Sequence, residues 1–154
     1  MNDRELYQQI LGLSTPWKVT GIRLSLASRQ VVVVAGYKEG TQFPCPSCGE
    51  LCGVYDHRRR NWRHLDTCQL QTLIEAEVPR VNCPEHGVQQ VMVSWAEPGG
   101  RFTALFEAMV IAWLGEAPIS AVAGLVGLTW DQVDGIQQRA IERGLTRRKP
   151  KEVA

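Results

Sequence analysis

Four side chains of metal-binding type occur as two matched pairs. Cys45 and Cys48 are three residues apart, as are Cys83 and His86, and in each pair a proline follows the first member and a glycine follows the second. Proline and glycine at these places predict that each pair lies on a tight turn. Thiolate and imidazole ligands suit zinc, and four protein ligands leave no position for a reactive water molecule. The sequence therefore predicts one structural zinc ion bound by all four residues.

Other assignments of the cysteines stay open. Cys45 and Cys48 would also fit as ordinary small side chains of a proline-rich loop. Cys52 follows closely enough to replace one ligand, whereas Cys68 stands at the entrance of an expected strand, where we expect it to be packed. If the metal is bound as predicted, a ribbon of this size would need it in order to fold.

Positive charge is concentrated in two segments. The formal net charge is only +1, but residues 139–151 hold six cations and one acid, and residues 57–64 read His-Arg-Arg-Arg-Asn-Trp-Arg-His. Clustered cations indicate nucleic-acid binding better than the total charge does. We expect the run at 57–64 on a loop of the ribbon, in contact with phosphates, although a solvated hairpin tip explains it equally well. The arginines concerned are Arg58, Arg59, Arg60 and Arg63. We expect His57 and His64 to be surface residues or phosphate contacts rather than metal ligands.

Alternating apolar residues predict the β-structure that positions the two ligand pairs. Residues 17–37 predict a β-hairpin that turns at 27–30, and residues 69–81 predict a long strand. Residues 88–95 predict a further strand, and residues 3–13 predict a short helix at the start of the chain. The side chains expected to face inward are Leu6, Ile10 and Leu13 in the helix, and Leu70, Thr72, Ile74, Ala76 and Val78 in the long strand.

After residues 97–100, which read Glu-Pro-Gly-Gly, the apolar period becomes helical. Residues 102–113, 118–126 and 129–144 each predict a helix, and glycine or proline separates one helix from the next. The first helix is expected to share one face among Phe102, Leu105, Phe106, Met109 and Trp113.

Residues 117–144 fit a helix-turn-helix, whose second helix lies in the major groove of DNA. If Val133, Ile136 and Ala140 face inward, Gln138 and Arg139 face outward and could reach the edges of adenine and guanine. The other expected DNA contacts are Thr129 and Trp130 at the helix start and Arg143, Arg147 and Arg148 near its end. Basic side chains would supply a salt-sensitive attraction to phosphates. The alternative is a three-helix packing module with a solvated basic end.

Thr129 and Gln132 also fit a capping box, in which the threonine caps the backbone and the glutamine reaches back.

Four short motifs occur together in this chain. They are Cys45-Pro-Ser-Cys48-Gly49, Arg63-His64-Leu65-Asp66, Val81-Asn-Cys83-Pro84-Glu-His86-Gly87-Val88 and Trp95-Ala96-Glu-Pro-Gly-Gly-Arg101-Phe102-Thr103. Their combination resembles the front end of insertion-sequence transposases of the ISL-three family, from about residue 15 onward. In that family a zinc-binding domain precedes a helix-turn-helix, and together they recognise the terminal inverted repeats of the element. The resemblance implies zinc at the four predicted ligands and DNA contacts from residues 117–145.

Full transposases of this type continue into a nuclease domain of ribonuclease-H-like fold, in which three carboxylates bind divalent metal. Because this chain ends at Ala154, we expect a truncated or split transposase that binds element ends and has no catalytic residues of its own. The alternatives are a zinc-ribbon adaptor for protein interactions and a stand-alone DNA-binding regulator. An enzyme with a metal centre at Cys83 and His86 is a further alternative, but Glu85 is the only carboxylate close to that pair in sequence.

The composition, with 44% hydrophobic and 21% charged residues, is that of a globular protein. No apolar run approaches the roughly 18 residues of a membrane span, and the polar start is unlike a secretory signal. We therefore expect a cytoplasmic, nucleoid-associated protein that binds double-stranded DNA and no membrane, with a second copy or a full-length transposase as further partners.

The predicted fold class is α+β, with a small antiparallel zinc-ribbon-like domain followed by a three-helix helix-turn-helix domain. The expected parts are 1–40, a helix and hairpin that pack on the ribbon; 41–96, the zinc ribbon; 97–148, the helix-turn-helix; and 149–154, a tail.

Overall fold

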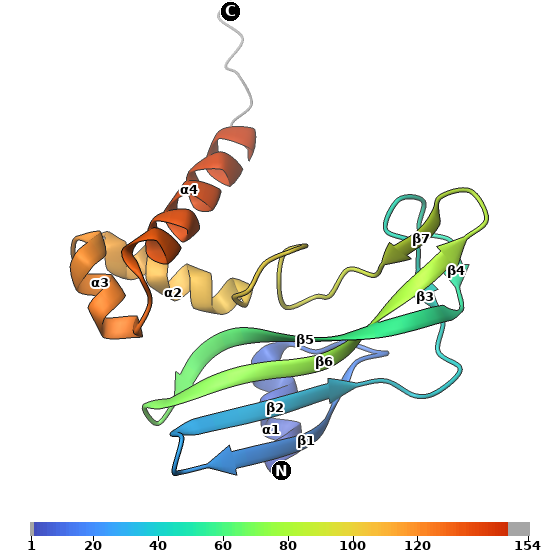
Figure 1. Ribbon diagram of the computed structural model, residues 1–154, viewed down its shortest axis with the longest axis horizontal. Coiled ribbons are helices and arrows are strands. Elements are labelled where there is room, and N and C mark those ends of the chain that lie inside the picture. The colour runs from blue at the N-terminus through green and yellow to red at the C-terminus, as the bar shows by residue number, and fades with distance from the viewer. Residues whose placement is uncertain (1, 148–154) are drawn as a thin grey trace, which may run out of the picture. The chain divides into compact units, whose positions relative to one another are not determined.

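The computed structural model describes the backbone of residues 2–147 and the side chains as far as Gly144 (Figure 1). The fold is α+β, as predicted, and divides into two compact units, one through Leu105 and the other from Phe106. The first unit contains α1 (Asp3–Leu11), β1 (Lys18–Ser25), β2 (Gln30–Gly36), β3 (Phe43–Pro44), β4 (Leu51–Cys52), β5 (Val54–Thr67), β6 (Leu70–Cys83) and β7 (Gly87–Gln90). The helices that follow are α2 (Ala104–Leu114), α3 (Ile119–Val126) and α4 (Trp130–Arg147).

The main sheet of the first unit has the strand order β1-β2-β6-β5, and β7 pairs with the last residues of β6. All of these pairings are antiparallel except that of β2 with β6, which is parallel. The hairpin that we expected to pack on the ribbon therefore shares its sheet. Figure 1 shows β3, β4 and β7 gathered at one end of β5 and β6, the end that carries both ligand pairs.

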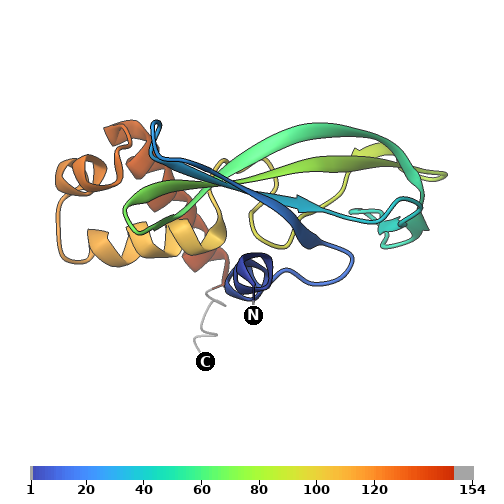
Figure 2. The same ribbon diagram turned by 90° about the horizontal axis from the view of Figure 1, so that it is seen from below.

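The core lies on one face of this sheet, where Figure 2 also shows α1. The predicted alternation in β6 is confirmed, because Thr72, Ile74, Ala76 and Val78 are buried. Beside them Trp17, Tyr37, Phe43, Trp62 and Trp95 form a chain of ring contacts with centroid distances of 4.9–5.8 Å. Large aromatic surfaces thus supply much of the buried area of a small domain.

The prediction of a loop at 57–64 was wrong, since these residues lie inside β5. β5 pairs with β6 along most of its length, from Val54 opposite Val81 to Thr67 opposite Leu70. The pattern of apolar residues missed this strand because its first half is largely exposed and its polar side chains need no alternation.

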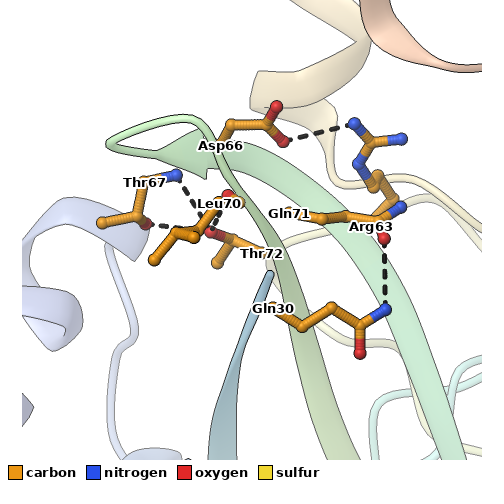
Figure 3. Close-up of polar contacts among 7 residues, drawn as sticks. All are labelled: Gln30, Arg63, Asp66, Thr67, Leu70, Gln71 and Thr72. Carbon is orange, nitrogen blue, oxygen red and sulfur yellow. Dashed lines mark hydrogen bonds and ion pairs between the residues drawn. The ribbon is translucent and has the colours of Figure 1, made fainter. Parts of the chain in front are cut away.

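The turn between β5 and β6 is held by threonine hydroxyls (Figure 3). The backbone N–H of Thr67 donates to Oγ1 of Thr72 at 3.1 Å, and the two hydroxyls are 2.9 Å apart. Cys68 and Gln69 occupy the turn with φ of 50° and 64°, the left-handed conformation of a tight hairpin turn. Cys68 is exposed there, so the expectation that it is packed was wrong.

Two helices turn different faces inward from those predicted. In α1, Leu11 and the following Leu13 are buried, whereas Leu6 and Ile10 are exposed. In α2 the buried positions are Phe106, Glu107 and Val110, whereas Leu105 and Trp113 are exposed. Both sequences carry apolar residues on more than one side, so periodicity alone did not select the buried face. Among the described residues, no helix combines the length and apolarity needed to cross a membrane.

Candidate functional site

The first ligand pair lies on a turn between two very short strands. β3 and β4 pair through Phe43 opposite Cys52 and Pro44 opposite Leu51. Within the turn, the N–H of Cys45 donates to the carbonyl of Glu50 at 2.9 Å, and that of Gly49 donates to the carbonyl of Cys45 at 2.8 Å. Gly49 has φ of 77°, a conformation that glycine adopts without steric cost. The chain can therefore reverse directly after the second ligand.

The second ligand pair lies on the turn from β6 to β7. Cys83, the last residue of β6, pairs with Gly87, the first of β7, so the ligands stand at the strand end and in the turn. Gly87 has φ of 72° and follows His86 as Gly49 follows Cys48. The two turns thus repeat one local design, as the matched spacing predicted.

The structure brings the four predicted ligands together. The ligand atoms of Cys45, Cys48, Cys83 and His86 all lie within 4.8 Å of one another. Sγ of Cys48 is 3.7 Å from Sγ of Cys83, and Nδ1 of His86 is 3.6 Å from Sγ of Cys83 and 3.9 Å from Sγ of Cys45.

These three of the six separations are close to the edges of a zinc tetrahedron, and the others are at most 4.8 Å. With Zn–S of ~2.3 Å and Zn–N of ~2.05 Å, tetrahedral geometry requires S···S of about 3.8 Å and S···N of about 3.6 Å. A disulfide would need sulfurs about 2.05 Å apart, so the contact between Cys48 and Cys83 is not one. The donor set and its geometry both fit zinc, and the four residues would hold it with no position left for substrate.

The surroundings of two ligands shift their pKa values in opposite directions, so that the thiolate form of Cys45 is favoured and that of Cys48 is not. A backbone hydrogen bond acts to lower the pKa of Cys48, but burial and the contacts with Cys83 and Cys45 raise this pKa to about 11. Burial acts to raise the pKa of Cys45, but hydrogen bonds from the backbone N–H groups of Ser47 and Cys48 outweigh it, so the pKa lies below its ordinary value. Gln89, which the sequence did not single out, places Oε1 3.7 Å from Sγ of Cys45 and accepts a hydrogen bond from Ser47 Oγ at 2.9 Å. Such outer contacts orient metal ligands.

Cys52 is not part of the cluster. Its thiol donates to the carbonyl of Glu50 at 3.4 Å, which suits a packed thiol rather than a ligand. The alternative ligand is therefore not supported.

The arginines of β5 have different surroundings. Arg58 and Arg59 are exposed, and Arg59 pairs with Glu75 of β6 at 3.3 Å. Arg60 lies over the ring of Trp62, 5.2 Å from its centroid, and donates to the carbonyl of Gly100 at 3.2 Å. Arg63 is 9% exposed and pairs with Asp66 at 3.2 Å, as Figure 3 shows. The structure therefore separates two exposed arginines from two that support the fold.

The two histidines of this segment also differ. His57 is exposed and bonds to Glu77 at 2.9 Å. His64, expected at the surface, is buried, and its Nδ1 is 2.8 Å from the hydroxyl of Thr103, which is 1% exposed. Burial lowers the pKa of His64 to about 4, so the ring is neutral at physiological pH.

The contact between His64 and Thr103 belongs to the segment 101–104 at the start of α2, which we call the strap. Arg63 and Thr103 are joined through backbone bonds of 2.9 Å, from the N–H of Arg63 to the carbonyl of Arg101 and from the N–H of Thr103 to the carbonyl of Arg63. The N–H of Ala104 donates to the carbonyl of Trp95 at 2.9 Å. The end of the first unit is thus fixed to β5.

The junction between α3 and α4 is built as the sequence predicted. Gly127 ends α3 with φ of 69°, and Thr129 precedes α4. The N–H of Gln132 donates to Oγ1 of Thr129 at 3.1 Å, and the N–H of Thr129 donates to Oε1 of Gln132 at 2.9 Å. This reciprocal pair is the capping box.

The expected contact residues on α4 are placed unevenly. Val133 and Ile136 are buried, Gln138 is exposed, and Trp130 has 52% of its surface exposed. Arg139 instead donates from Nε to the carboxylate of Glu107 on α2 at 3.1 Å. Glu107 was not predicted, because its position on an apolar helix gives no sign of a partner 32 residues away. Arg148 and the side chain of Arg147 lie outside the described residues.

Two family comparisons cover these structures. Residues 41–86 match the zinc finger of transposases IS204/IS1001/IS1096/IS1165, and residues 91–141 match the helix-turn-helix domain of transposase family ISL3. These two segments of the chain match the zinc-finger and helix-turn-helix domains of ISL3-family transposases. The resemblance deduced from the motifs is thereby confirmed.

Curated relatives agree with this family. The transposases for insertion sequence element IS1557 from two strains of Mycobacterium tuberculosis, CDC 1551/Oshkosh and ATCC 25618/H37Rv, are each 40% identical over 98 residues. The match covers 62% of this chain and 22% of each relative, so the chain corresponds to about a fifth of their length. No solved structure matches the chain.

Proposed function

We propose that this chain is the sequence-specific DNA-binding portion of a transposase and that it recognises the terminal inverted repeats of its element. The proposal rests above all on the matches to both segments of the ISL3 family, one of which is a DNA-binding helix-turn-helix domain. Double-stranded DNA is the partner, and DNA binding would bring the protein to the nucleoid.

In this proposal one zinc ion, held by Cys45, Cys48, Cys83 and His86, is structural. Zinc would join the β3–β4 turn to the β6–β7 turn, which are otherwise connected by the hydrogen bond from Ser47 to Gln89 and by the packing of Cys45 and Cys83 in the core. Bound zinc supplies electrostatic cross-linking and no catalysis here, because four protein ligands close its coordination sphere.

The helix α4 is the proposed reading element. Gln138 is exposed on it and can form two hydrogen bonds to adenine. Thr129 accepts the capping bond from Gln132 and keeps its O–H to donate to a phosphate. Trp130, beside it, is half exposed. Arg139 and Arg143 complete the set among the described side chains, and Arg147 and Arg148 remain expected phosphate contacts.

On β5, Arg58 and Arg59 are the arginines best placed for a second phosphate contact. Arg60 and Arg63 were proposed with them, but their bonds within the fold make them supports of that surface. We also infer that the two matched segments serve binding and not strand cleavage, since the residues that the structure describes place four potential metal ligands in a closed Cys3His set.

The test is selection of duplexes from a randomised library, followed by titration of the selected duplex and a scrambled duplex of equal composition at several salt concentrations. The proposal expects preference for the selected duplex and affinity that falls steeply with salt. Comparison of the selected sequence with inverted repeats near the coding sequence then tests the element-end assignment. Equal, salt-independent binding to both duplexes would contradict it.

A second function, protein interaction, is favoured by exposed apolar side chains of the helical unit. Leu125, Trp130 and Ile141 are 70%, 52% and 48% exposed. A cavity of about 310 Å³ lies between α2 and α4, lined by Ile111, Leu114, Gly115, Gln137, Ala140 and Ile141. Apolar surface of this kind favours a protein partner, such as a second copy or a full-length transposase. An adaptor of this type would show no DNA shift near physiological salt.

A further inference from the structure

A buried carboxylate in the helical unit is shared by two arginines of α4. Glu107 of α2 has only 7% of its side chain exposed. Arg139 donates to its Oε1 through both Nε and Nη2, and Nη1 of Arg143 lies 3.6 Å from its Oε2. Burying a carboxylate costs free energy unless the carboxylate is paired. The ion pairs with Arg139 and Arg143 offset this cost, and they also restrain the two guanidinium groups.

A glycine on α4 adds to this arrangement. Gly135 lies one helical turn before Arg139, and a β-carbon added there would be 3.4 Å from Nη1 of Arg139. The guanidinium therefore lies back along the helix, in space that a larger side chain at 135 would occupy. Glycine inside a helix is less favourable than alanine, so this position gives up helix stability in return for that space.

The guanidinium of Arg139 still has donors available. It carries five N–H groups in a rigid plane, of which Glu107 receives two, and 40% of the side chain is exposed. Because Glu107 holds the guanidinium group of Arg139 on one side, the remaining N–H donors point in a fixed direction. A fixed direction is what allows an arginine to select one base edge or phosphate over another.

We propose that Glu107 is a positioning residue for DNA recognition, and that it fixes Arg139 on α4 in the orientation in which the arginine contacts DNA. This inference rests on the proposed function. It assigns a recognition role to a residue of α2 that has no need to touch DNA.

The central variant is Glu107→Gln, which keeps the shape of the side chain and removes its charge. Its matched control is Glu116→Gln, which removes the same charge at an exposed position after α2. Each variant loses one negative charge, so the net charge of each becomes more positive by one and both should bind scrambled DNA slightly more tightly. Only Glu107→Gln should lose discrimination between the library-selected and scrambled duplexes, by about tenfold, the loss expected for one specific arginine contact.

Two further variants separate positioning from stability. Arg139→Ala should lose the same discrimination, and the double variant with Glu107→Gln should lose no more than either alone, because both act through one contact. Gly135→Leu should displace the guanidinium and lose discrimination while circular dichroism shows that α4 is retained, since leucine favours the helix. The Nε–H resonance of Arg139 in free protein should be protected in wild type and in Glu116→Gln, and should lose protection in Glu107→Gln.

The outcomes distinguish the two proposals. A wild-type protein that selects no duplex refutes the proposed function and the positioning role with it. Wild-type selection together with unchanged discrimination in both Glu107→Gln and Gly135→Leu overturns the positioning role alone. Tighter, still selective binding by Glu107→Gln beyond the control also overturns it, since Glu107 would then mask Arg139.

Discussion

The metal-ligand end of the sheet and the helix α4 differ in what fixes the positions of their functional side chains. All four predicted ligands converge within 4.8 Å, whereas the arginine predicted to read bases is bonded to a buried glutamate of another helix. The ligands are paired locally, so their spacing encodes most of their geometry. The direction of a long side chain on a helix depends on tertiary neighbours that spacing does not reveal.

Removal of one metal ligand should have the largest effect, because the two ligand turns depend on the zinc that joins them. Cys48→Ala or Cys83→Ala should abolish zinc binding and unfold the region 43–95, because structural zinc contributes roughly 10 kcal/mol or more to domains of this size. Circular dichroism and amide exchange would measure the loss. Cys68→Ala is the matched control, since Cys68 is exposed in the β5–β6 turn and should leave folding unchanged. A Cys48→Ala protein with native exchange protection in this region would show that bound metal does not stabilise it.

The buried pair of His64 and Thr103 should have the next largest effect. Thr103→Val removes a buried hydroxyl and leaves the imidazole without its partner, at a cost of about 1–3 kcal/mol in the free energy of unfolding. Denaturant titration would measure it. Thr41→Val, at an exposed loop hydroxyl, serves as the control, and equal losses in the two variants would show that the strap adds no stability.

The same pair predicts a pH dependence of stability. Burial lowers the pKa of His64 to about 4 from an ordinary 6.5, so the unfolded chain binds a proton at higher pH than the folded chain does. Stability should therefore be complete above about pH 6.5 and fall as the pH drops toward about 4. Between pH 7.5 and 5.5, His64→Gln should flatten this decline, and His57→Gln should not. Parallel declines in wild type and His64→Gln would refute the assignment.

The capping box at the start of α4 should contribute less to stability than the pair of His64 and Thr103 does. Thr129→Ala removes the hydroxyl that accepts from the N–H of Gln132 and should cost about 1 kcal/mol, while Thr129→Ser should retain most of the cap. Thermal unfolding of the two variants gives the comparison directly. If serine and alanine behave alike, the cap bond does not stabilise the helix.

The smallest effect concerns the arginines of β5. Arg58→Ala should weaken binding to selected and scrambled duplexes alike and reduce the salt slope by about one, as expected for a single phosphate contact. Arg4→Ala, at an exposed position of α1, is the control for the loss of one charge. A change in sequence preference, or none in the salt slope, would remove Arg58 from the proposed contacts.

The features that the sequence predicted well are those in which neighbours along the chain determine the geometry. The alternation in β6, the two ligand turns and the capping box at Thr129 all follow from spacing of a few residues. The strand β5 escaped because its polar half is largely exposed and pairs with β6 through backbone bonds and ion pairs such as that of Arg59 with Glu75, which leave no alternation of apolar side chains. The burial of His64 and Glu107 escaped because each is paired with a residue more than 30 positions away.

X-ray absorption at the zinc edge of the purified chain would identify the bound metal and its ligand atoms. We expect one zinc per chain, surrounded by three sulfurs at ~2.3 Å and one nitrogen at ~2.0 Å. Absence of stoichiometric zinc, or a coordination shell in which oxygen replaces these sulfurs, would contradict it.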